Sequence, residues 1–396
     1  MTQPIRPAGS PPALLPARRP TRRTLGRSAQ AGVALALLAL AGGAPRLAAA
    51  AAAPPPPPPP PSSPTTGHAR PLLSQGVEVG RQPDGSVVVP TDQVITPAGQ
   101  QVEFSGRPNA VAVSPDGTTA AYLTAGAAAA GGPITLVDLA TGAIKQAFSP
   151  GDRSASFDGL LYAPNGRHLY ASFNDGKILI ADVAADGTLS LGALVALPPV
   201  VGVSAPGGNP ATPNPGGLAL SPDGTTLYVA LNRTNALGVI DLARQKLVAQ
   251  IPVGNAPHSV VVDGDTAYVS DEGGRVAATG DVTNTSSGTA IVANPTTGGA
   301  ATGAVSVVDL AARATTRTIA VGLHPTALYL DRQALFVANT NGDSVSVISP
   351  TTNQVVKTIS IQPFPGAPFG SQPDALTRLP DGRLVVGLGS NNALAV

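Results

Sequence analysis

The sequence predicts an all-β fold made of repeated four-stranded antiparallel sheets, and three observations support this prediction. A unit recurs along the chain from Arg107 onward, and most copies open with a proline followed by a short apolar strand. Apolar residues alternate with polar ones inside these strands, which is the period of β-structure. Pro-Asp-Gly or Pro-Asn-Gly turns separate the first two strands of several copies, at 115–117, 164–166, 222–224 and 380–382. One such sheet cannot bury both of its faces, so the copies are expected to pack radially into a β-propeller.

The expected strands can be placed copy by copy. The copies open at Arg107, Phe157, Pro215, Pro257, Pro325 and Pro373. The clearest strands are expected at 157–162, 168–173, 178–183, 189–197, 215–220, 226–231, 237–242, 246–253, 325–330, 334–339, 344–349 and 355–361. The fourth copy is interrupted by an insertion at 273–303, and the sixth stops at Val396 after its third strand. We therefore expect five full blades and a truncated sixth, with the segment Val77–Phe104 helping to close the ring.

The chain is expected to consist of three parts. Residues 1–53 have the order of a bacterial export signal: an Arg-rich segment at 18–27, an apolar run at 31–41 and an Ala-rich stretch at 48–53. The core at 21–25, Thr-Arg-Arg-Thr-Leu, resembles a twin-arginine signal. The apolar run is shorter than the about 20 residues that span a membrane, so no membrane span is expected. A Pro-rich linker follows at 54–76, and the propeller covers 77–396. This organisation predicts a periplasmic or extracellular protein.

Composition excludes several functions. The chain has no cysteine, so disulfides, thiolate metal sites and cysteine nucleophiles are excluded. The formal net charge is +1, but the leader alone carries seven arginines and no acid, so the mature part is mildly acidic. Nucleic acid is therefore not an expected partner, because its phosphates require clustered Lys and Arg.

The second strands carry a recognisable motif. It reads Phe-Val-Ala-Asn at 336–339, Tyr-Val-Ala-Leu at 228–231, Tyr-Val-Ser-Asp at 268–271 and Tyr-Ala-Ser-Phe at 170–173. With the adjoining segments 344–348 and 322–325, this resembles the bacterial YVTN-type (YncE-like) propeller repeat, over about 107–396. The resemblance implies a seven-bladed propeller, although the motif is thinner in the first and last copies. In some exported relatives such a propeller precedes an alkaline-phosphatase-like phosphoesterase domain. We therefore expect this chain, which ends mid-blade, to be part of a longer protein with a C-terminal enzyme domain.

Candidate site residues gather where the loops should meet at the mouth of the ring. His258 and His324 lie near blade starts but are one position out of register, because Pro257 aligns with Pro325. Asn and Asp recur in the loops between second and third strands, where they would either crown one rim or simply satisfy turns. The rim could bind a polar ligand or, as a weaker alternative, Ca²⁺ through oxygen. No catalytic constellation, zinc-binding spacing or other metal site is found. The candidate binding residues are His258, Asp271, His324, Asn339, Asn341, Asp343 and Asn391.

The leading hypothesis is a monomeric, exported binding or scaffold module without catalysis of its own. Its partner would be a protein, or a polar small molecule or glycan at the propeller face. The alternative is a lactonase-like propeller hydrolase, which would need His, Arg and Glu to converge, although the chain has only three glutamates, Glu78, Glu103 and Glu272. Quinoprotein propellers rely on tryptophan, which is absent here. The insertion at 273–303 is either a partner-binding element or a disordered segment.

Overall fold

The computed structural model describes residues 78–89, 93–96, 99–125, 133–151, 155–200, 211–364 and 370–396. The predicted export signal at 1–53 and the Pro-rich linker at 54–76 lie outside the described residues. Among the residues described, no helix is long and apolar enough to cross a membrane.

Five four-stranded antiparallel sheets form the body of the protein, and in each the strands pair in chain order. The first blade contains β4 (Arg107–Val113), β5 (Thr119–Ala125), β6 (Ile134–Asp138) and β7 (Ile144–Phe148). The second contains β8 (Ala155–Tyr162), β9 (His168–Phe173), β10 (Lys177–Val183) and β11 (Leu189–Ala196). The third contains β12 (Pro215–Leu220), β13 (Thr226–Leu231), β14 (Ala236–Asp241) and β15 (Lys246–Pro252).

The remaining blades follow the same plan. The fourth contains β16 (Asn255–Asp263), β17 (Thr266–Gly274), β20 (Ala304–Asp309) and β21 (Ala314–Ala320). The fifth contains β22 (Pro325–Leu330), β23 (Leu335–Asn339), β24 (Ser344–Ser349) and β25 (Gln354–Ser360). The sixth has three strands, β26 (Pro373–Arg378), β27 (Leu384–Leu388) and β28 (Ala393–Ala395).

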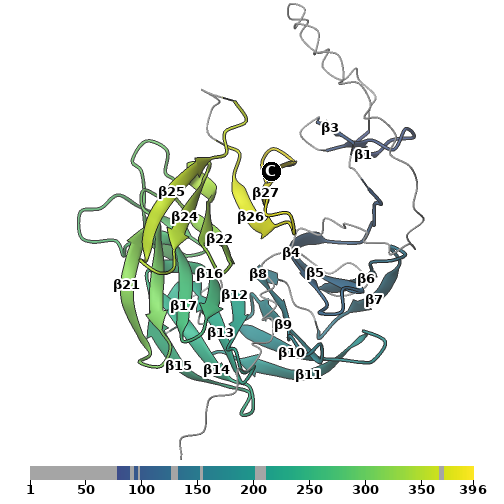
Figure 1. Ribbon diagram of the computed structural model, residues 1–396, viewed down its shortest axis with the longest axis horizontal. Helices are drawn as coiled ribbons and strands as arrows, with labels where there is room; N and C mark the ends of the chain where they lie inside the picture. Colours follow the sequence, from purple (N-terminus) through teal and green to yellow (C-terminus); the bar gives the residue numbers. More distant parts are fainter. Residues whose placement is uncertain are drawn as a thin grey trace, which may run out of the picture.

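The blades are arranged as a propeller. Figure 1 shows the first strand of each blade facing the centre of the ring and the fourth strand on its outer side. Consecutive innermost strands contact one another from β4 through β26. Apolar side chains fill the space between neighbouring sheets, and Phe173 and Leu123 are among the largest that are fully buried. The sheets of the second to fifth blades therefore bury both faces against their neighbours, as the radial arrangement requires, and the predicted β-propeller is confirmed.

The Pro-Asp-Gly turns form between first and second strands, as expected. In the third blade, Asp223 Oδ1 accepts hydrogen bonds from Ser221 Oγ at 2.6 Å and from the backbone N–H of Thr225 at 3.1 Å. Gly224 has φ +70°, a left-handed conformation that glycine adopts without strain. The turn sequence thus sets where the second strand begins.

The N-terminal segment ties the two ends of the ring together. It forms a small sheet of its own, β1 (Gly80–Arg81), β2 (Val87–Val88) and β3 (Val94–Ile95). This sheet lies on the side of the ring where the first and last blades face each other (Figure 1). Asn392 Nδ2 donates a hydrogen bond to Gln93 Oε1 at 2.6 Å, and the Phe104 ring lies 5.1 Å from that of Tyr122 in the first blade. The segment thus contacts both end blades without adding a strand to either sheet.

The insertion of the fourth blade is a β-hairpin, β18 (Thr283–Ser286) and β19 (Thr289–Val292). Ile291 is buried against Ala256 and Ala300. Thr289 Oγ1 donates a hydrogen bond to Asn232 Oδ1 of the third blade at 3.0 Å. The alternative of a disordered insertion is therefore wrong, because the hairpin packs on the ring.

Candidate functional site

The candidate site is built around one position in the first strand of successive blades. The pairing of first and second strands is irregular at this point in each blade. Such bulges re-aim side chains. Regular pairing resumes two residues later in the second to fifth blades, at Leu160, Leu218, Val260 and Leu328, and one residue later in the sixth, at Ala375. The equivalent residues at the irregularity are Asp158, Gly216, His258, Thr326 and Asp374.

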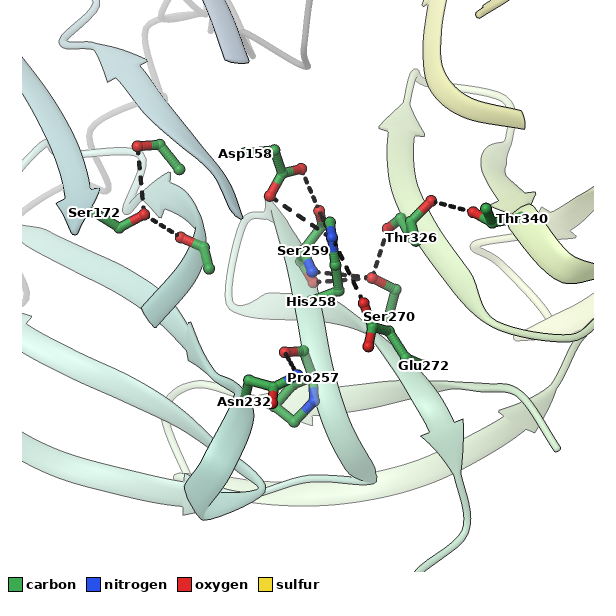
Figure 2. A network of polar contacts seen from close by, with 12 residues as sticks. Asp158, Ser172, Asn232, Pro257, His258, Ser259, Ser270, Glu272, Thr326 and Thr340 are labelled. Atoms are coloured by element: carbon green, nitrogen blue, oxygen red, sulfur yellow. Dashed lines mark hydrogen bonds and ion pairs between the residues drawn. The ribbon is translucent and has the colours of Figure 1, made fainter. Parts of the chain in front are cut away.

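Two histidines and two carboxylates meet there and form what we call the His–carboxylate cluster: Asp158, His258, Glu272 and His324. His258 Nδ1 lies 3.7 Å from Asp158 Oδ1, and its Nε2 lies 3.6 Å from Glu272 Oε1. His324 Nε2 lies 3.6 Å from the same Glu272 oxygen. The Glu272 side chain is only 3% exposed, while that of His324 is 23% exposed. Figure 2 shows His258 between Asp158 and Glu272, which come from β8 and β17.

Asp158 reaches the cluster across an entire blade. It belongs to the second blade, yet its Oδ2 accepts a hydrogen bond at 2.7 Å from Ser259 Oγ of the fourth blade. The third blade places Gly216 and Gly217 between them. A Cβ atom on Gly217 would lie 2.9 Å from the Ser259 Cα, closer than atoms tolerate. The two glycines therefore allow β8 and β16 to approach over β12.

The cluster contains oxygen atoms with unused capacity to accept hydrogen bonds. Asp158 Oδ1 is buried and has no hydrogen-bond partner within the described part of the chain. Glu272 Oε2 accepts a hydrogen bond from Ser286 Oγ of the hairpin. The two imidazoles lie 3.6 Å from Glu272 Oε1, beyond the usual N–H···O range of about 2.7–3.2 Å. Buried polar groups are normally paired, so Asp158 Oδ1 indicates a place for a donor from outside the chain.

The electrostatics favour a neutral His324 and an acidic site. Burial lowers the pKa of His324, an effect that Glu272 opposes and His258 reinforces. Asp374 is exposed as a residue, but its carboxylate lies against the backbone near Gly389, and this desolvation raises its pKa, with His258 opposing the shift. Among the described residues, no Lys or Arg forms an ion pair with Asp158, Glu272 or Asp374.

A belt of hydrogen bonds fixes the inner strands around the cluster, and Figure 2 shows two of its members, Asn232 to Pro257 and Ser270 to Thr326. In each case a side chain at the end of one second strand donates to a backbone carbonyl that opens the next blade. The pairs are Ser172 to Gly216 at 2.9 Å, Asn232 to Pro257 at 3.5 Å, Ser270 to Thr326 at 2.7 Å and Thr340 to Pro373 at 2.8 Å. The third and fifth blades have Ala230 and Ala338 at the serine position, so the donor there comes from two residues further on. The belt holds neighbouring blades in fixed relative positions.

The structure brings only some of the predicted site residues together. His258 and His324 both join the cluster, but they hold different positions in their blades, as expected: His258 follows Pro257, whereas His324 precedes Pro325. His324 has φ +53°, and Ala256, the residue before Pro257, has φ +54°. The one-position offset between the two histidines is compatible with a shared carboxylate, because both Nε2 atoms face Glu272.

The Asn and Asp residues predicted for the rim have mainly internal contacts. Asp271 is fully buried and accepts a hydrogen bond from Ser306 Oγ at 2.7 Å, and buried Asn339 donates to Ser346 Oγ at 3.0 Å. Buried Asp343 accepts from the backbone of Gly370 and Gln372. Asn341 and Asn391 are partly exposed, and Asn391 donates to Ser371 Oγ at 3.0 Å. The turn-satisfying alternative therefore describes Asp271, Asn339 and Asp343.

Sequence reasoning missed Asp158, Glu272, Ser259 and Asp374. An alignment of the copies on their opening residue contained a signal for two of them, because Asp158 and Asp374 occupy the position of His258. Nothing comparable marks Glu272, which follows the second strand motif at the start of the insertion. The described residues contain no group of three or more His, Asp or Glu side chains placed to hold a metal ion.

A separate hollow of about 530 Å³ lies between the first and second blades. It is lined by Tyr162, whose buried hydroxyl has no partner among the described residues, and by the turns containing Asp116 and Asp186. Both carboxylates already accept hydrogen bonds from their own turns.

Comparison with known proteins supports the fold alone. No family model matches the chain, and neither does any curated protein. Among solved structures, hydrazine synthase from Kuenenia stuttgartiensis aligns with a TM-score of 0.50 and 18% identity, covering 74% of this chain and 76% of that one. A functionally unknown protein from Desulfotomaculum acetoxidans aligns with a TM-score of 0.46 and 17% identity, covering 67% and 74%. The chain is therefore a β-propeller protein, and its function has to be argued from its own residues.

Proposed function

We propose that this chain is an exported, YVTN-type propeller module that binds a polar ligand at the His–carboxylate cluster. The observation that carries the proposal is the buried Asp158 Oδ1, which has no partner among the described residues although it faces His258 at 3.7 Å. Leaving a buried polar group unpaired costs about 1–3 kcal/mol, and more for a charged one. A ligand that donates to this oxygen would offset that cost.

The arrangement around the cluster is rigid, which favours binding. The inner strands that hold Asp158 and His258 are joined by hydrogen bonds from blade to blade. The insertion hairpin fixes Glu272 through Ser286. A preorganised site spends less of its binding free energy on ordering its own side chains.

Export and the domain context are part of the same proposal. The basis for export to the periplasm or the outside of the cell is the Arg-rich, apolar and Ala-rich order of residues 1–53. The second-strand motif supports membership of the YVTN-type family, and through it a C-terminal phosphoesterase partner domain. Fractionation of cells that express the full reading frame tests the export: we expect the mature protein in the periplasm or medium, and retention in the cytoplasm would contradict it.

A hydrolase is the second candidate, because the structure brings His258, His324 and Glu272 together. In that case His324, held by Glu272, would serve as a general base. His258 is less suited, since both of its ring nitrogens face carboxylates. A lactone panel tests this candidate: turnover that is lost in His324→Asn but retained in Asp223→Asn would make the protein an enzyme.

Ligand screening with matched variants tests the binding proposal. Thermal shifts would be measured for a panel of polar small molecules and glycans with the wild type, Asp158→Asn and Asp223→Asn. Asp223 lies in an exposed turn at the far end of its strand, and Asn165 holds the equivalent turn of the second blade, so this control variant should fold. We expect ligands that stabilise the wild type and Asp223→Asn but not Asp158→Asn. A panel in which no ligand depends on Asp158 would refute the proposal.

A further inference from the structure

The His–carboxylate cluster has the chemistry of a receptor for a positively charged donor group, and this inference rests on the proposed binding function. Asp158 and Glu272 each direct an oxygen toward the histidines without a hydrogen bond inside the usual range. Asp374 also interacts electrostatically with His258. Two carboxylates, Asp158 and Glu272, therefore lie beside the two imidazoles, and burial lowers the pKa of His324.

No Lys or Arg in the described part of the chain occupies this place. Among the described residues, every ion pair of Asp158 and Glu272 is with a histidine. Two aspartates elsewhere in the protein do have arginine partners: Asp331 forms an ion pair with Arg378, and Asp281 forms one with Arg275. A buried carboxylate that lacks an Arg or Lys partner is stabilised by a cation from solution.

We propose that the cluster binds a small molecule with two primary ammonium groups, one donating to Asp158 Oδ1 and the other to Glu272 Oε1, on the two sides of the His258 ring. The donors matter as well as the charge, because the acceptors are specific oxygen atoms in a buried position. Within the described part of the chain, the ion pairs of Asp158 and Glu272 are with histidines, and the chain has no Trp, so the recognition is assigned to the carboxylate oxygens and not to an aromatic face.

His324 makes this binding dependent on pH. It faces Glu272 and His258, while His258 faces Asp158 from β8 and Glu272 from β17 and interacts electrostatically with Asp374 of β26. When the His324 imidazole gains a proton, it satisfies Glu272 and repels a second cation. Affinity for an amine therefore rises with pH through the range in which His324 loses its proton.

Calorimetry with three probes of similar size tests the proposal. Putrescine carries primary ammonium groups, 1,4-butanediol replaces them with neutral hydroxyls, and tetramethylammonium keeps the charge without N–H donors. At pH 8 we expect putrescine to bind, butanediol to show no binding and tetramethylammonium to bind at least about tenfold more weakly. Asp158→Asn and Glu272→Gln should each weaken putrescine binding about ten- to a hundredfold, the loss of one charge-assisted hydrogen bond. Asp223→Asn should bind as the wild type does.

The pH arm and the folding control complete the test. Putrescine affinity of the wild type should fall at least about tenfold between pH 8 and pH 5.5, and far-UV circular dichroism should show that every variant is folded. Putrescine binding no tighter than butanediol, or unaffected by Asp158→Asn, would overturn the amine assignment. If a neutral glycan then binds in an Asp158-dependent way, the binding function stands and only the ligand class fails. If no ligand depends on Asp158, both proposals fail.

Discussion

Asp271 is expected to destabilise the protein as the pH rises, and replacing it with Asn should remove this effect. The residue is fully buried at the end of β17, where Oδ2 accepts one hydrogen bond from Ser306 and Oδ1 has no partner among the described residues. Burial raises the pKa of Asp271 well above its ordinary value of 3.8, and the Ser306 bond opposes the shift only partly. Asn339 occupies the equivalent position in the fifth blade, so the fold accepts an amide there.

The sign and the size of this change in stability with pH follow from proton linkage. Above pH 3.8 the unfolded carboxyl loses its proton while the folded one keeps it, so the folded state binds one proton more. The contribution of Asp271 to the free energy of unfolding of the wild type therefore falls by about 1.4 kcal/mol per pH unit until the folded pKa is passed. Asp271→Asn has no carboxyl group at this position and lacks this pH dependence. The free energy of unfolding of the variant should exceed that of the wild type by little near pH 3.8, and the difference should grow by about 1.4 kcal/mol per pH unit.

Urea unfolding followed by far-UV circular dichroism between pH 4 and pH 8 measures the difference. Asp223→Asn is the matched control, because hydrogen bonds from Ser221 and Thr225 lower the pKa of Asp223. Its stabilisation is present above the unfolded pKa and lost in acid, so this variant should lose stability relative to the wild type as the pH rises. Wild-type and Asp271→Asn curves that run parallel over the whole pH range would refute the reasoning.

Three further outcomes are expected. Ser270→Ala removes the donor to the next blade's carbonyl at 2.7 Å and should lower the free energy of unfolding by about 1–3 kcal/mol in urea titrations; an unchanged midpoint would contradict the role of the belt. Gly159→Ala places a Cβ 2.3 Å from the backbone oxygen of Gly216 and should cost about 1–3 kcal/mol or more, seen as a lower melting temperature. Because burial lowers the pKa of His324, wild-type stability should decline as the pH falls below 6.5. His324→Asn, which keeps the left-handed backbone that Asn214 adopts at the same position, should show a smaller decline in the same titration.

Much of the blade architecture could be predicted because local signals set the strand ends. The strands at 215–220, 226–231 and 325–330 are confirmed to the residue. Here a proline opens the first strand, and in the third blade a Pro-Asp-Gly turn separates the first two. β8 begins at Ala155, two residues before the expected start at Phe157, because no proline marks its opening. The small sheet β1–β3 was expected only as a closing segment, since its two-residue strands carry almost no periodic signal.

The candidate site was predictable only in part. The repeat placed His258 and His324 near the ring mouth, since both flank blade-opening prolines. Their partner Glu272 depends on where the long insertion leaves the sheet, and Asp158 comes from a blade two positions away. Contacts of this kind depend on how the blades are placed in the ring, which local sequence patterns do not encode.

The glycine pair of the third blade has a consequence for how the ring unfolds. A repeat protein whose units touch only their neighbours unfolds as a one-dimensional array, in which each interface breaks on its own. The Ser259–Asp158 bond links the second blade directly to the fourth above Gly216 and Gly217. Opening the third blade therefore also strains a link between its two neighbours, and these three blades should exchange their amide hydrogens as one cooperative unit. A ligand held by Asp158 and Glu272 would strengthen that unit and leave the first and sixth blades to open on their own.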